Sequence, residues 1–175
     1  MSTWLISDQG PYKSGSAAKT LAGGLLPLAA TLAAPHIVAA WDTADPRRTF
    51  FHGHSFTAHP LACAVAAANW RILTSELLTA PRAMHAFWSE ALTPLRDHPK
   101  VRQVRLRGSI AAVELDVAGG YLADVGRTLR RACLADGVLL RPLGAVLYAI
   151  PPLCTSPESL ASIARAMIRA VKSLE

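Results

Sequence analysis

An uncharged stretch at residues 21–40 constrains the fold of this chain more than any other feature of its sequence. A segment of this length is long enough to cross a bilayer. However, Gly23 and Pro27 interrupt it, so it does not read as one continuous membrane helix. We expect instead a buried strand over 27–33, followed by a helix that begins at Pro35, because proline suits the first turn of a helix. The chain is therefore predicted not to enter a membrane.

The composition is that of a globular chain with no nucleic-acid partner. Of the 175 residues, 51% are hydrophobic, which excludes a disordered chain, and the formal net charge is +6. The densest basic group is Lys100, Arg102, Arg105 and Arg107, which alternates along an expected strand. No aromatic residues interleave with these charges, as a base-stacking surface would require. We interpret the group as a solvated strand face.

The cysteines indicate a reducing compartment. Cys63, Cys133 and Cys154 are odd in number, far apart and not part of any CxxC pair. We expect reduced and mostly buried thiols. The N-terminal sequence MSTWLISDQG lacks the basic segment and the long apolar run of a secretory signal. A cytoplasmic location is the prediction.

Two kinds of structure follow each other along the chain. Pro60 is expected to begin a long alanine-rich helix to about residue 78, apolar nearly all round and therefore buried. A second helix is expected over 81–96. The loop RDHPK then marks the expected boundary between a first domain, 1–97, and a second, 98–175.

The second part has the pattern of a small α+β lobe. We expect two strands around Gly108, an amphipathic helix over 122–135 that ends before Gly137, and short strands over 138–144 and 146–152. A last helix has two overlapping start signals, Ser156 before Pro157 and Thr155 three residues before Glu158. The fold class is thus α/β for the first part and α+β for the second.

A cluster of histidines in FFHGHSFTAHPLACA has three interpretations. His52, His54, His59 and Cys63 are donors of the kind that zinc accepts. Glycine, small hydroxyls and a helix that opens at Pro60 would equally form an anion pocket, which we favour. The remaining interpretation is structural packing.

Two isolated basic residues suggest chemistry. Lys19 lies just ahead of a glycine pair between apolar segments, where desolvation favours the neutral amine that Schiff-base chemistry needs, although such a lysine is more often a surface residue. Arg141 lies between two expected strands without other charges, and its guanidinium fits a carboxylate. Tyr148 could share the same pocket. The alternative for Arg141 is a structural salt bridge, for example to Glu114.

The motifs KTLAGGLLPLAATLA, HGHSFTAHPLACA and LLRPLGAVLYAIPP, in this order and spacing, resemble class III pyridoxal-phosphate aminotransferases. The resemblance runs from about Lys19 to the C-terminus. It implies the C-terminal part of a fold-type-I transferase, namely a remnant of the large α/β domain and the small domain. It is closest to the branch that transfers an amino group from S-adenosylmethionine to 8-amino-7-oxononanoate in biotin biosynthesis.

The resemblance also implies site residues. Lys19 would form the Schiff base with pyridoxal 5'-phosphate and shuttle a proton. Ser55, where the family usually has threonine, would bind the cofactor phosphate together with His54. Arg141 would receive the substrate carboxylate, and Gly53 and Tyr148 would line the substrate pocket.

Departures from the family limit what is expected of this chain. Ala18 replaces the usual serine, and the family's upstream half, with the aspartate that pairs with the pyridinium nitrogen, has no counterpart. We expect weak or no activity from the 175 residues alone, and a homodimer or pairing with a chain that supplies the missing half. The alternatives are an ω-aminotransferase of the same class, a non-catalytic interaction module and a small zinc protein.

Overall fold

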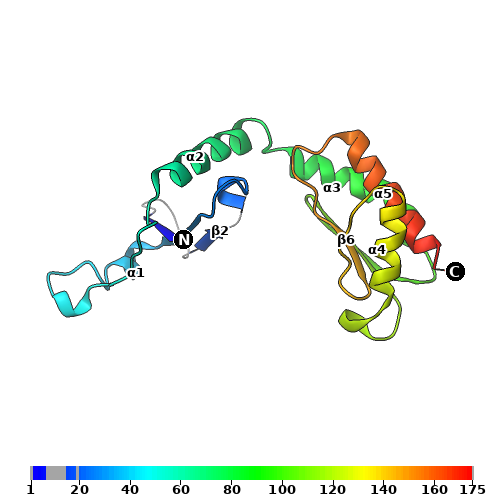
Figure 1. Cartoon of the computed structure of the whole chain (residues 1–175), viewed down its shortest axis with the longest axis horizontal. Coiled ribbons are helices and arrows are strands. Elements are labelled where there is room, and N and C mark those ends of the chain that lie inside the picture. Colours follow the sequence, from blue (N-terminus) through cyan, green and yellow to red (C-terminus); the bar gives the residue numbers. More distant parts are fainter. Residues whose placement is uncertain (1, 7–14, 19, 175) are drawn as a thin grey trace. The chain divides into compact units, whose positions relative to one another are not determined.

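The chain divides into two compact units, residues 1–76 and 77–175 (Figure 1). The computed structural model describes residues 2–6, 15–18 and 20–174. The expected division fell at 97/98 and assigned helix α3 (Ala80–Ala91) to the first part. In the structure, Met84 and Trp88 of α3 belong to the core of the second unit. The expected domain boundary at 97/98 stays a prediction about the whole protein.

The first unit is built around a small three-stranded sheet. Strand β3 lies in the middle, parallel to β1 and antiparallel to β2. The strand expected over 27–33 and the helix expected at Pro35 are both confirmed, the helix as a single turn. The elements are β1 (Ser2–Ile6), β2 (Gly15–Ala18), η1 (Thr20–Ala22), β3 (Ala29–Ala33), α1 (Pro35–Val38), η2 (Pro46–Arg48) and α2 (Pro60–Ser75).

Helix α2 is less buried than its sequence predicts. Its Ala62 and Ala66 pack with Ala22 and Leu28 in a small core, and the Asn69 side chain donates a hydrogen bond to the Leu21 carbonyl at 3.1 Å. Only these two alanines of α2 are buried, so the expectation of a buried helix was wrong for this chain. The other described elements of the unit cover only one narrow stripe of α2. No helix in the described ranges is long and apolar enough to cross a membrane.

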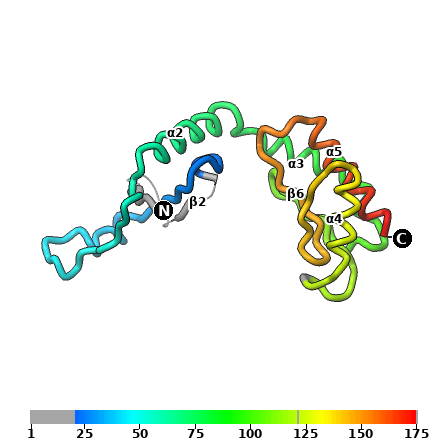
Figure 2. The backbone as a smooth tube through the Cα atoms, viewed as in Figure 1, coloured from blue at the N-terminus to red at the C-terminus, as the bar shows by residue number. Residues whose placement is uncertain are grey.

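The second unit has a larger core. Three antiparallel strands in the order β4-β5-β6 present their alternate buried residues to α3, α4 and α5. Trp88 is fully buried there, and its indole N–H donates to the Ser109 carbonyl at 3.1 Å. Figure 2 traces this unit from α3 to the C-terminal α5. The elements after α3 are η3 (Thr93–Leu95), β4 (Val101–Arg107), β5 (Ile110–Leu115), η4 (Gly120–Leu122), α4 (Val125–Ala135), β6 (Val146–Ala149) and α5 (Pro157–Lys172).

The strand expected over 138–144 is not formed. Leu143 pairs with Val146 in an isolated bridge, and Gly144 has a positive φ of 54°. The chain therefore turns back tightly before β6, because a left-handed residue cannot continue a strand and glycine adopts it without strain. This turn carries Arg141 and Pro142 towards the start of α4.

The expectation that the basic residues of β4 form a solvated strand face is confirmed, and two of them make exposed ion pairs. Arg102 on β4 lies 2.8 Å from Asp116, and Arg105 lies 2.6 Å from Glu114 of β5. The hydrogen bond and charge of Asp116 raise the pKa of Arg102. The expectation of mostly buried thiols was only partly right. Cys133 is buried, which raises its pKa to about 11, whereas Cys63 is partly exposed and Cys154 is exposed.

Candidate functional site

The loop that precedes α2 is closed by its own hydrogen bonds. The His54 amide donates to the Thr57 hydroxyl at 3.1 Å, and the Thr57 amide donates to the His54 carbonyl at 2.9 Å. The His54 ring accepts from the Phe56 amide at 3.2 Å through Nδ1. Ala58 then takes a left-handed conformation, with φ of 52°. These hydrogen bonds join residues on both sides of Ser55 and hold the loop in a tight turn.

His59 ends the loop and caps helix α2. Its Nδ1 accepts from the Ala62 amide at 3.4 Å, and its carbonyl accepts from the Cys63 amide at 3.0 Å. The Nδ1 lone pairs of His54 and His59 are thus both used by backbone amides. Across the described ranges, no group of three His, Cys, Asp or Glu side chains could hold a metal ion.

Ser55 has spare hydrogen-bonding capacity in this loop. Its side chain is exposed and makes no hydrogen bond with any residue that the structure describes. Five residues later α2 begins, and the amides of a helix N-terminus favour anions. The loop could therefore offer a hydroxyl donor to a phosphate. Nothing lies within 4 Å of a Cβ built on Gly53, so sterics alone do not require glycine there.

A small hollow of about 170 Å³ lies beside the loop. Phe56 and His59 line it together with Leu26, Pro27 and Ala62. Its walls are largely apolar, and His59 is the titratable residue among them. The hollow shows that the loop and the segment before β3 pack loosely against the start of α2.

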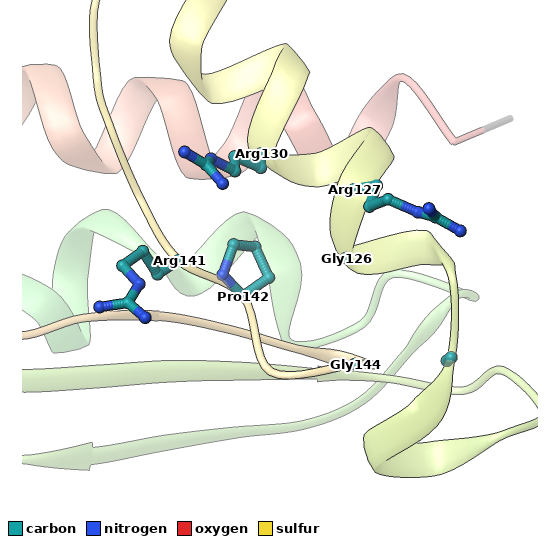
Figure 3. Close-up of a pocket in the computed structure, with 7 residues that line it drawn as sticks. Gly126, Arg127, Arg130, Arg141, Pro142 and Gly144 are labelled. Atoms are coloured by element: carbon teal, nitrogen blue, oxygen red, sulfur yellow. The ribbon is translucent and has the colours of Figure 1, made fainter.

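Arg141 lines a separate pocket of about 300 Å³ inside the second unit (Figure 3). The pocket lies where the start of α4 meets the turn before β6. A Cβ on Gly126 would lie 2.9 Å from the Gly144 carbonyl oxygen, so only glycine permits this approach of helix and turn. The lining residues are Ala123, Gly126, Arg127, Arg130, Arg141, Pro142 and Gly144.

The Arg141 guanidinium is available to a ligand. Glu114, the acid considered as its structural partner, instead pairs with Arg105 at 2.6 Å and with Arg102 at 3.7 Å. No described residue forms an ion pair or hydrogen bond with Arg141. The alternative of a salt bridge to Glu114 was therefore wrong, because the neighbouring strand supplies closer arginines.

Tyr148 is not among the residues that line this pocket. It lies on β6, where Leu147 and Ala149 point into the core, so the partly exposed Tyr148 belongs to the opposite face of the sheet. The part of Tyr148 in a substrate pocket stays a prediction.

Sequence reasoning missed the two arginines that α4 contributes to the pocket. Arg127 and Arg130 are three positions apart on α4, and both line the pocket. That spacing was visible in the sequence as part of an amphipathic helix. What was not visible is the turn before β6, which brings Arg141 to the same pocket.

Lys19 lies outside the described residues. The structure describes its neighbours in sequence, since β2 ends at Ala18 and η1 begins at Thr20. The roles of Lys19, Gly53, His54, Ser55, Arg141 and Tyr148 therefore stay predictions, with Ser55 and Arg141 each in surroundings suited to an anion.

Most of the chain is similar to known aminotransferases. An adenosylmethionine-8-amino-7-oxononanoate aminotransferase of Synechococcus elongatus is 44% identical over 147 residues, which are 83% of this chain and 34% of that protein. The crystal structure of the enzyme so named from Methanocaldococcus jannaschii has a TM-score of 0.83 and 27% identity, over 92% of this chain and 39% of that one. A PLP-bound amine transaminase from an uncultivated Pseudomonas species has a TM-score of 0.83 and 26% identity, over 93% and 39%.

The likeness confirms the expected fold class, part of a fold-type-I PLP transferase. The chain spans about a third of the length of the curated relative and about two fifths of the solved structures. The sequence model of the family described as Aminotransferase class-III matches residues 16–171. With nearly the whole chain matched, this protein belongs to the class-III aminotransferase family.

Proposed function

We propose that this chain contributes part of the active site of a PLP-dependent aminotransferase that transfers an amino group from S-adenosylmethionine to 8-amino-7-oxononanoate. The product would be 7,8-diaminononanoate, in biotin biosynthesis. The relatives named for this activity support the proposal. The observation that carries it is the pocket of Arg141, whose guanidinium has no acidic partner among the described residues. A carboxylate at one end of the substrate would satisfy it.

The loop before α2 fits the phosphate end of pyridoxal phosphate, because the Ser55 hydroxyl has no hydrogen-bond partner among the described residues and a helix N-terminus follows it. The bound cofactor would supply an electron sink for the amino-transfer chemistry. Ser55 would donate to the phosphate, and His54 would keep the loop closed through its bonds to Phe56 and Thr57. Lys19 would hold the cofactor covalently and move a proton at the reacting carbon.

Substrate contacts are proposed for three residues of the chain. Arg141 would hold the carboxylate with paired hydrogen bonds, since the guanidinium fork matches that geometry. Gly53 and Tyr148 would line the rest of the substrate site. A cytoplasmic location is part of the proposal, because three free thiols suit a reducing compartment.

An ω-aminotransferase is the second candidate, favoured by the likeness to a PLP-bound amine transaminase. The two candidates differ in what they require of Arg141. An acceptor with a carboxylate needs it, whereas a simple amine donor does not. Loss of 8-amino-7-oxononanoate binding in Arg141→Gln, without loss of binding of a carboxylate-free amine, would favour the first candidate.

Covalent labelling tests the proposal without depending on turnover. The 175-residue chain is incubated with pyridoxal phosphate, treated with borohydride and mapped by peptide mass spectrometry. We expect the reduced pyridoxyl group at Lys19 in preference to Lys13, Lys100 and Lys172. Ser55→Ala should lower the labelling of Lys19 at limiting cofactor several-fold, whereas Thr49→Ala, in an exposed position before the loop, should not.

Even labelling of all four lysines would contradict the proposed role of Lys19. Amino transfer by the chain alone is expected to be weak or absent, since it spans only about a third of the related enzyme. Strong transfer that disappears in Lys19→Ala would contradict that expectation while supporting the lysine's role.

A further inference from the structure

We propose that Arg130 is a second anion-binding residue of the Arg141 pocket, so that the substrate carboxylate is held between two guanidinium groups. The inference rests on the proposed function, which gives Arg141 a carboxylate to bind. It adds a specificity-determining residue on a different element, α4. Its consequence is a pocket that favours a carboxylate over a neutral group of the same shape.

The position of Arg130 follows from the contact between α4 and the turn. Gly126 brings the first turn of α4 against Gly144, and Arg130 lies one helical turn further along the same face. In Figure 3, Arg130 and Arg141 extend towards the same side of the pocket, whereas Arg127 extends the other way. One anion can therefore approach Arg130 and Arg141 together.

The charges around the pocket are unbalanced. Asp124 pairs with Arg127 at 2.5 Å, and Asp136 at the other end of α4 pairs with Arg169 at 3.1 Å. Arg130 and Arg141 have no ion pair with any residue that the structure describes. The two acids that flank α4 are thus already occupied, and two positive charges remain on one side of the pocket.

Two guanidinium groups change what the pocket selects. A carboxylate between them gains a second charge-assisted hydrogen bond and the attraction of a second cation, while an amide gains little. Both side chains are exposed, so solvent screens the added charge. We therefore expect Arg130 to contribute a factor of about three to five in affinity, less than Arg141 and reduced by added salt.

Octanoate and octanamide are suitable probes, because they share a shape and differ in charge. Binding to the ¹⁵N-labelled chain is followed through the arginine Nε–H resonances, assigned by substitution. Arg130→Gln is compared with Arg131→Gln, which removes the same charge from the next residue of α4, outside the pocket lining. Circular dichroism checks that each variant keeps its fold, which is expected because both side chains are exposed.

Octanoate should shift the Nε–H signals of both Arg130 and Arg141, and Arg130→Gln should weaken its binding about three- to fivefold. Arg131→Gln should change it by less than twofold, and octanamide should bind weakly to every form. Equal effects of Arg130→Gln and Arg131→Gln, with a large loss in Arg141→Gln, would overturn the inference and leave the role of Arg141 intact. No effect of Arg141→Gln would overturn both.

Discussion

Gly126 shows how the absence of one side chain shapes a pocket. It lies in the first turn of α4, where alanine would ordinarily be preferred by roughly 0.5–1 kcal/mol. Here the space for a Cβ is already taken by the Gly144 carbonyl, a backbone atom that cannot rotate away. The close approach of helix and turn therefore outweighs helix propensity at this position.

Gly126→Ala is expected to destabilise the second unit, opposite to the usual effect of this substitution in a helix. Overpacking of this kind costs roughly 1–3 kcal/mol, so a net loss of about 1 kcal/mol or more in the free energy of unfolding should appear in urea denaturation. Thr128→Ala, at an exposed position of the same helix, should be neutral or slightly stabilising. A stabilised Gly126→Ala variant would show that the turn can move away freely.

Helix α5 has the clearest start signal among the elements. Two overlapping signals were present in the sequence, and the structure uses the one at Ser156. Its hydroxyl accepts from the Ser159 amide at 3.3 Å, whereas the Thr155 hydroxyl donates to the Pro152 carbonyl at 2.7 Å. The amide of Glu158 and the Ser156 hydroxyl also lower the pKa of the exposed Glu158 carboxyl.

Ser156→Ala should lower the free energy of unfolding by about 1 kcal/mol, because one amide of the first turn loses its acceptor. Thr155→Ala should cost clearly less, since its hydroxyl caps no helical amide. Thermal unfolding followed by circular dichroism measures both. A larger loss for Thr155→Ala would mean that the helix begins one residue earlier.

Helix starts that are marked by nearby residues could be predicted from the sequence. Features that depend on contacts between residues distant in the sequence could not. Pro35, Pro60 and Pro157 each mark the first residue of a helix, as expected. The burial of α2 was predicted wrongly, because composition shows that a face is apolar but not what covers it. The same holds for the site. Arg141 could be singled out as a guanidinium in need of an anion, whereas Arg130 joined it only through the turn before β6.

The two units differ in how much core they possess. The second has eighteen buried residues in one cluster, among them Trp88, Leu129 and Met167. Among the residues whose burial the structure describes, the core cluster of the first unit has four members, three of them alanines. Trp70 and Leu61 of α2 are 61% and 66% exposed. Exposed apolar surface of this extent is typical of a surface that binds another protein chain.

We expect the 175-residue chain to self-associate and the fragment 77–175 to be a folded monomer. Sedimentation velocity gives the masses, and urea unfolding of the fragment should be cooperative, because its core is complete in itself. Trp70→Gln should weaken the association, whereas Leu122→Gln, also exposed but in the second unit, should not. A monodisperse monomer of the full chain would contradict the expected pairing.

The order of strands in the second unit has a consequence for its behaviour at high concentration. Strand β4, at one edge of the sheet, carries Arg102, Arg105 and Arg107. Strand β6, at the other edge, is only four residues long, and Pro151 and Pro152 follow it within three residues. The arginines of edge strand β4 discourage another strand from pairing with it, and so do the shortness of edge strand β6 and the prolines that follow it. Both features therefore work against aggregation by strand addition. We therefore expect the second unit not to aggregate at millimolar concentration, even though the first unit is expected to self-associate.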